Sequence, residues 1–207
     1  MIKLGSIFPE FDEQLISYLL KVGEQIDVSA GELLLRPGQY VNNTMLVLDG
    51  VSKLYLQGDK GEELFLYFLE PGTVCALSIL CATSQNINVT AKALTDMRLL
   101  IVSVDEMDRL VRNYPNWYHF LIDAYQRRFR ELLQTVYQVA FQSLDEKLVA
   151  YLRKHFTVMK TKTVSMTHQD IASDLNSSRE VISRLLKKLE TDNKISISRN
   201  EITNLLL

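Results

Sequence analysis

Four polar residues near the C-terminal end of the chain have the types and the spacing needed to contact the edges of DNA bases. They are Arg179, Glu180, Ser183 and Arg184, and helical neighbour spacing would place them together on one face of a helix. An arginine can bind guanine O6 and N7 through two hydrogen bonds, and a glutamate can accept one from the N4 amino group of cytosine. The same residues would also suit a solvated, ion-paired helix face, so their surroundings must decide between the two interpretations.

Six further polar residues nearby are candidates for contacts with the phosphate backbone. Backbone N–H groups at a helix N-terminus attract anions, and a hydroxyl or amide side chain placed there can add a hydrogen bond to a phosphate oxygen. Lysine and arginine add the positive charge on which nonspecific DNA affinity depends. The candidates are Thr167, Gln169, Ser178, Lys187, Lys188 and Arg199.

The elements that would position these side chains form a predicted helix-turn-helix within residues 164–189. Thr167 and Ser177 each have an acidic residue three positions later, which is a helix-start signature. Asn176 lies between the two predicted helices, where a sharp turn needs the left-handed backbone that asparagine tolerates. The second helix would be capped and exposed, and such helices place their N-terminal residues in the major groove. The predicted core consists of the small Ala172 with Ile171, Leu175, Val181, Ile182, Leu185 and Leu189.

A long helix is predicted upstream, from Asn116 to Gln142, and it carries two apolar stripes. A helix that lies on a single globule needs only one such face. We therefore expect one stripe to pack on the chain's own core and the other to pair with a second copy of the chain, although a helix enclosed within one large monomer is the alternative. The first stripe contains Trp117, Leu121, Tyr125, Leu132 and Val139, and the second, which is close to a coiled-coil seam, contains Ile122, Phe129, Leu133, Val136 and Ala140.

Before this helix, the chain has the pattern of a small β domain. A short helix is predicted over Glu13–Val22, and from Gln25 to Val104 short apolar or alternating runs are separated by turn residues. About eight short strands without intervening helices favour a β-barrel or jelly roll. Another short helix is predicted over Val104–Val111.

Charge and composition indicate an ordinary globular protein with two different parts. The 207 residues are 47% hydrophobic and carry a net charge of −2, which excludes a disordered or fibrous chain. Residues 1–111 carry 8 Lys and Arg against 15 Asp and Glu, whereas residues 145–207 carry 11 against 8. This difference suggests two modules with different partners, although chance variation in surface charge would also produce it. With two cysteines, no export signal and no apolar run of about 18 residues, we expect a cytoplasmic protein that does not interact with membranes.

The sequence offers little for enzyme chemistry. The three histidines, His119, His155 and His168, all lie outside the predicted barrel, so the clustered ligands of a barrel metalloenzyme are missing. We find no phosphate-binding loop of the Walker type and no nucleophile elbow. We therefore expect no catalytic residues, no metal and no cofactor. Haem ligation by His119, Cys75 or Cys81, and a thiol switch at the cysteines, stay open, but packing roles are favoured for these residues.

The order of barrel, long helix and SREVISRLLKKLE segment resembles the catabolite activator/fumarate-nitrate regulator (CRP/FNR) family of bacterial transcription regulators. The resemblance covers nearly the whole chain and is strongest over residues 167–190 and at Gly31, Gly38, Gly50 and Gly72. It implies an α+β fold with an N-terminal double-stranded β-helix (jelly-roll) barrel over 1–115, a long dimerisation helix over 116–143 and a winged helix-turn-helix over 144–207. The family's members are homodimers, and the resemblance implies RNA polymerase as a partner.

The resemblance also assigns roles to single residues. Arg179, Glu180 and Arg184 match the family's base-reading positions, and Ser183 matches a serine of its anaerobic branch. Lys194–Leu207, with Arg199 and Asn200 at a hairpin tip, matches the wing.

The chain departs from the family at the phosphate cassette of the cyclic-nucleotide binders. The cassette's glycine, glutamate and arginine are missing from the matching segments, and a buried phosphate without a compensating cation is costly. Cyclic AMP bound in the family's usual way is therefore not expected, and the N-terminal cysteines of the iron–sulfur branch are missing too. The candidate effector-pocket residues are Cys75, Ala76, Leu77, Ser78, Asn88 and Val89.

The sequence thus predicts a homodimeric transcription regulator that reads a palindromic DNA operator, with an unidentified small effector, if one exists. The alternative is a ligand-sensing barrel protein that acts through protein–protein contacts, with the helix-turn-helix as a docking surface. Sequence-selective DNA binding that depends on Arg179 and Arg184 would distinguish the two.

Overall fold

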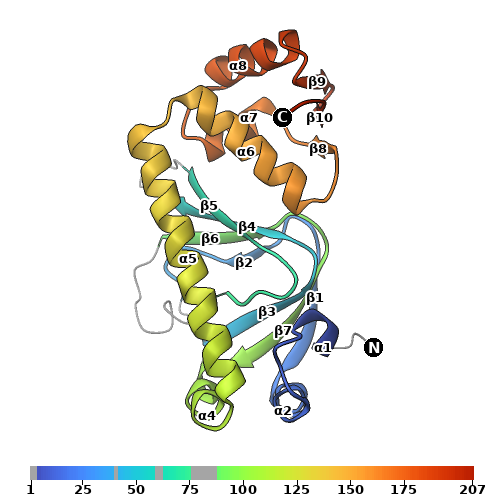
Figure 1. Ribbon diagram of the computed structural model, residues 1–207, viewed down its shortest axis with the longest axis vertical. Helices are drawn as coiled ribbons and strands as arrows, with labels where there is room; N and C mark the ends of the chain where they lie inside the picture. Colours follow the sequence, from blue (N-terminus) through green and yellow to red (C-terminus); the bar gives the residue numbers. More distant parts are fainter. Residues whose placement is uncertain (1–3, 40–41, 59–62, 76–87) are drawn as a thin grey trace. The chain divides into compact units, whose positions relative to one another are not determined.

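A computed structural model describes residues 4–39, 42–58, 63–75 and 88–207 of the chain (Figure 1). The chain divides into two compact units. The first comprises Met1–Leu54 and Tyr67–Leu133, and the second comprises Tyr55–Leu66 and Gln134–Leu207. None of the helices in the described ranges is long and apolar enough to cross a membrane.

The N-terminal part of the chain combines two β-sheets with a group of helices. Helices α1 (Leu4–Ile7) and α2 (Glu13–Val22) precede the strands, and η1 (Val104–Glu106), α4 (Met107–Asn113) and α5 (Pro115–Phe141) follow them. The strands form one sheet in the order β1-β7-β3 and another in the order β2-β6-β4-β5. Their bounds are β1 (Glu24–Val28), β2 (Leu33–Leu35), β3 (Asn43–Asp49), β4 (Ser52–Gln57), β5 (Glu63–Leu69), β6 (Val89–Ala93) and β7 (Met97–Ser103). This arrangement confirms the predicted jelly-roll domain.

The three-stranded sheet is covered on both faces. Successive side chains of a strand point to opposite sides. Leu100 and Val102 of β7 join Leu46 and Leu48 of β3 in a core cluster with the helices, while Leu99, which points the other way, is also fully buried. At the turn between β3 and β4, Gly50 has φ +80°, and a Cβ there would lie 2.2 Å from the carbonyl oxygen of Asp96. Only glycine fits this turn.

Helix α5 confirms the predicted long helix, shifted by one residue at each end. Its buried residues include Trp117 and Leu121 of the first predicted stripe, but Leu132 is 39% exposed, because the core cluster that covers the helix ends at Ala124. The second stripe, by contrast, is exposed: Phe129, Leu133 and Val136 have exposed fractions of 63%, 54% and 63%. The sequence missed three further buried positions, which are Phe120, Ala124 and Arg128.

The C-terminal part contains the helix-turn-helix and a small antiparallel sheet. Its helices are α6 (Leu144–Val158), α7 (His168–Asp174) and α8 (Arg179–Thr191), and its strands are β8 (Thr163–Ser165), β9 (Ile195–Ser198) and β10 (Glu201–Asn204). The strand order is β8-β10-β9, so that β9 and β10 form the predicted C-terminal hairpin, with Asn200 at φ +58° in its tip. This fold confirms the predicted winged helix-turn-helix.

The core of the helix-turn-helix differs from the prediction in one respect. Ile182, Leu186 and Leu189 of α8 are buried, while Leu175, Val181 and Leu185 are only half-buried. The buried face of α8 therefore runs through residues spaced four and three apart, and Leu185 lies beside it. A buried hydrogen bond of 2.6 Å from the Tyr151 hydroxyl to Asp174 Oδ2 connects α6 to the end of α7.

The predicted domain boundaries at 115/116 and 143/144 stay a prediction. Along the chain, the division into two compact units falls within α5, between Leu133 and Gln134, and on both sides of Tyr55–Leu66.

Candidate nucleic-acid interface

A serine caps the first turn of α8, and this N-cap lies one residue later in the chain than predicted. Ser178 is the N-cap: its Oγ accepts a hydrogen bond of 3.3 Å from the backbone N–H of Val181. Ser177, the predicted cap, still belongs to the turn, because its backbone N–H donates to the carbonyl oxygen of Ala172. The helix-start signature at Ser177 and Glu180 was therefore wrong.

The turn between α7 and α8 has the predicted left-handed residue. Asn176 has φ +48°, and its backbone N–H donates to the carbonyl oxygen of Ser173. Helix α7 begins with the predicted capping box, in which Thr167 and Asp170 exchange hydrogen bonds. The two helices are held together by the fully buried Ile171, Ala172 and Ile182. This packing fixes α8 with its N-terminal half exposed.

Three of the four predicted base-reading side chains are exposed at this end of α8. They are Arg179, Glu180 and Arg184, and no carboxylate of the described residues lies within ion-pair distance of either arginine. Hydrogen bonds lower the pKa of Glu180, first from its own backbone N–H and then from the Ser178 hydroxyl. Glu180 is therefore a carboxylate at neutral pH and can accept a hydrogen bond from a cytosine amino group.

The fourth residue, Ser183, is in a different situation. It is half-buried, and its Oγ lies 2.8 Å from Nδ1 of His168, the first residue of α7. No sequence pattern connects these two residues, since their separation of 15 positions matches no motif. The contact exists because the N-terminal end of α7 lies against the second turn of α8.

A cleft of about 370 Å³ brings several predicted DNA contacts together. It is bounded by the start of α7, the start of α8 and the β9–β10 hairpin, and its lining includes Thr167, Gln169 and Arg179. Arg199 is exposed at the tip of the same hairpin. The cleft thus brings together candidate residues from the starts of two helices, and the hairpin that carries Arg199 forms its third wall.

The remaining candidates for phosphate contacts already have partners within the protein. Lys187 forms an ion pair with Glu190 on α8 at 2.8 Å, and Lys188 forms one with Asp145 of α6 at 3.2 Å. Lys188 therefore points towards α6. The Thr167 hydroxyl is likewise engaged with Asp170, at 2.7 Å.

The candidate effector pocket is only partly described. Cys75 and Val89 are buried and Asn88 is exposed. Ala76, Leu77, Ser78 and Cys81 lie outside the described residues. Among the described side chains, no group of three His, Cys, Asp or Glu residues could hold a metal ion.

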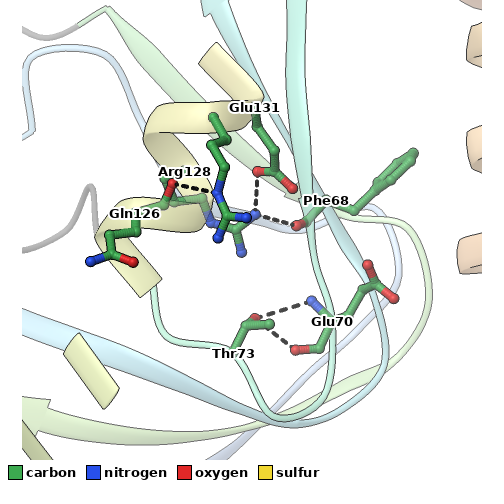
Figure 2. A network of polar contacts seen from close by, with 7 residues as sticks. Phe68, Glu70, Thr73, Gln126, Arg128 and Glu131 are labelled. Atoms are coloured by element: carbon green, nitrogen blue, oxygen red, sulfur yellow. Dashed lines mark hydrogen bonds and ion pairs between the residues drawn. The ribbon is translucent and has the colours of Figure 1, made fainter. Parts of the chain in front are cut away.

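A buried cation, which the sequence analysis missed, lies next to the barrel strands. Arg128 of α5 is 7% exposed, and its guanidinium lies 4.0 Å from the centre of the Tyr67 ring. Its Nη1 donates to Glu131 Oε2 at 2.7 Å and to the carbonyl oxygen of Phe68 at 3.4 Å, as Figure 2 shows. Its Nε is buried and has no hydrogen-bond partner among the described residues. The one visible signal was helical spacing, since Arg128 follows Leu121 and Ala124 on the buried face.

Comparisons with known proteins cover both parts of the chain. Residues 25–114 match the family model described as cyclic nucleotide-binding domain, and residues 146–206 match the Crp-like helix-turn-helix domain. The chain is 24% identical to a global nitrogen regulator of Synechocystis over 81% of its length and 78% of the relative. It is 23% identical to the nitrogen fixation regulation protein FixK of Bradyrhizobium diazoefficiens over 98% of its length and 86% of the relative.

Solved structures agree with the fold. A transcriptional regulator of the CRP/FNR family from Eubacterium rectale has a TM-score of 0.81 at 24% identity, covering 97% of this chain and 94% of the other. The cyclic-di-GMP-responsive regulator CLP of Xanthomonas campestris has a TM-score of 0.82 at 18% identity, covering 93% and 99%.

Proposed function

Since the chain belongs to the CRP/FNR family of transcription regulators, we propose that it reads a palindromic DNA operator as a homodimer in the bacterial cytoplasm. The observation that supports this most directly is the exposed N-terminal half of α8, where Arg179, Glu180 and Arg184 face solvent on a capped helix. In the dimer, the two α8 helices enter successive major grooves about 34 Å apart. The alternative, a docking module without sequence-specific DNA binding, is not favoured, because the relatives named above are regulators and share the helix-turn-helix.

The exposed stripe of α5 supports the homodimer. Phe129, Leu133, Val136 and Ala140 are spaced four, three and four residues apart, which is the a/d spacing of a coiled-coil seam. Ile122 continues the stripe towards the N-terminal end and is 37% exposed. A contiguous apolar surface of this kind is unusual on a monomer. A two-fold pairing along α5 would also match the two-fold symmetry of a palindromic operator.

The effector and the protein partner are proposed more broadly. A small effector would act by binding two arrangements of the dimer with different affinity, and the missing cassette residues argue against cyclic AMP. The described part of its pocket is the buried pair Cys75 and Val89 with the exposed Asn88. RNA polymerase is the proposed protein partner, as in the family.

The proposal is tested at Arg184. Replacing Arg184 by alanine should weaken binding to the preferred operator by about 1–3 kcal/mol and relax the preference at one base position of each half-site. Lys187→Ala is the matched control on the same helix face, and it should weaken binding to all sequences equally and reduce the salt dependence. Fluorescence anisotropy on the operator and on its single-base variants measures both effects. If Arg184→Ala lowered affinity equally for every sequence, the base-reading role would be wrong.

A further inference from the structure

A histidine is hydrogen-bonded to the central residue of the proposed base-reading surface. His168 is the first residue of α7, and its Nδ1 lies 2.8 Å from Oγ of Ser183 in the second turn of α8. Both side chains are half-buried. Ser183 directly precedes Arg184 and lies one helical turn after Arg179. The hydrogen bonds that the Ser183 hydroxyl can form with DNA therefore depend on His168, because the imidazole already uses part of its hydrogen-bonding capacity.

The proton on His168 decides which part of that capacity is used. A serine hydroxyl has one proton to donate and two lone pairs that accept. When Nδ1 carries no proton, the Ser183 hydroxyl must donate to it, and only the lone pairs of Oγ can contact DNA. When Nδ1 carries a proton, it donates to Oγ, and the hydroxyl proton becomes available. The imidazolium has protons on both nitrogens, so it allows only the second arrangement.

We propose that His168 is a specificity-determining residue that sets whether the Ser183 hydroxyl can donate a hydrogen bond to a base edge. The inference rests on the proposed function, namely that α8 reads DNA. Guanine and thymine offer acceptors in the major groove, whereas adenine N6 and cytosine N4 offer donors. A charged His168 leaves the Ser183 hydroxyl proton free to donate, which favours guanine or thymine opposite it. A neutral His168 whose Nδ1 carries no proton takes up that hydroxyl proton and leaves only lone pairs, so adenine and cytosine gain relative to guanine and thymine.

The preference should therefore change with pH, since a histidine changes charge between about pH 5 and 8. The charged residues lining the cleft beside His168 are Arg179 of α8 and Glu201 of β10. On α7, the Asp170 carboxylate is engaged with Thr167. Bound DNA phosphates favour the imidazolium as well, so acid should also raise the overall affinity. The other charged residues around Ser183 on α8 are Glu180, Arg184 and Lys187.

The test measures base preference at two pH values. Anisotropy titrations of the full-length protein use its preferred palindrome and the variants at the base pair whose preference is lost in Ser183→Ala. At constant ionic strength, between about pH 6 and about pH 8, we expect the ratio of affinities for acceptor and donor bases to fall about fivefold, the size of one net hydrogen bond. His168→Asn should hold this ratio within about twofold, because asparagine does not titrate.

His119→Asn, at an exposed histidine of α5, is the matched control and should keep the wild-type pH response. Thermal unfolding of each variant at both pH values shows that the changes do not come from loss of fold. A base preference that is independent of pH in the wild type overturns the inference, as does a pH response that persists in His168→Asn. If the palindrome is bound and depends on Arg184, such a result leaves the proposed function intact. If no palindrome is bound, the proposed function and the inference about His168 are both wrong.

Discussion

Arg128 is the residue whose environment differs most from what its type suggests. Its guanidinium is buried against the Tyr67 ring and bound to Glu131, whose side chain is 28% exposed. Placing a charge inside a protein is tolerated only where partners compensate for the lost hydration. The partners of Arg128 are Glu131 on its own helix and Tyr67 and Phe68 of β5, so that this cation connects α5 to a barrel strand.

This arrangement predicts that alanine substitutions at two neighbouring arginines lower the free energy of unfolding by different amounts. Arg128→Ala removes a buried ion-pair partner and its packing, so the free energy of unfolding should fall by about 2–4 kcal/mol. Arg127→Ala, at an exposed position of the same helix turn, should change it by less than about 0.5 kcal/mol. Urea denaturation of the two variants gives both values. Equal costs for the two substitutions would contradict the buried role of Arg128.

The sequence could not identify Arg128 because residue type and helical spacing disagree there. Arginine is almost never buried, so residue type alone gives no reason to place Arg128 on the buried face. Periodicity alone places 128 on the face of Trp117, Leu121 and Ala124. His168 could not be found either, because its contact with Ser183 depends on how two separate helices pack.

At the scale of elements, the turn between α7 and α8 sets the direction of α8 relative to α7. Asn176 supplies the left-handed backbone of this turn, which lies between Leu175, the C-cap of α7, and Ser178, the N-cap of α8. A change in the backbone conformation of the turn would rotate α8 relative to α7. Arg179 and Arg184 would move with α8.

Two substitutions at Asn176 should therefore have opposite outcomes. Asn176→Val forces a β-branched residue into φ +48° and should lower the free energy of unfolding by about 1–2 kcal/mol. Asn176→Gly adopts the same backbone without strain and should leave stability within about 1 kcal/mol of the wild type. Thermal and urea unfolding distinguish them. A turn that tolerated valine as well as glycine would show that the left-handed residue has no structural role.

The elements themselves were largely predictable, while their ends and faces were less so. Strong apolar periodicity identified α2 and α5 to within a residue, and the glycines marked turns that do have positive φ. The start of α8 was misplaced because Ser177 and Ser178 both suit an N-cap, and only the conformation of the turn selects between them. Leu185 and Leu186 were confused for a related reason: a one-residue difference decides which leucine faces the core.

At the scale of the whole molecule, the exposed stripe of α5 predicts the assembly. Phe129→Glu combined with Val136→Glu places two charges in the proposed seam, so the protein should sediment as a monomer where the wild type sediments as a dimer. Gln134→Glu lies on the same helix outside the stripe and should leave the dimer unchanged. Analytical ultracentrifugation measures all three. A dimer that survived the double substitution would place the interface elsewhere.

The distribution of charge fits a regulator that needs selective contacts. The net charge of −2 gives little general attraction to DNA, so binding must depend on the local cations of the C-terminal part. Arg179, Arg184 and Arg199 are exposed there on α8 and the hairpin tip.

The central claim is that this dimer reads a palindrome through α8, and selection of duplexes from a random DNA library by the purified, ligand-free protein tests it most directly. Two inverted half-sites with centres about one helical turn apart should be enriched by the wild-type protein. In the Arg184→Ala variant, one base position of each half-site should lose its preference. If neither the free protein nor the protein supplemented with cell extract enriched any palindrome, the claim would be contradicted.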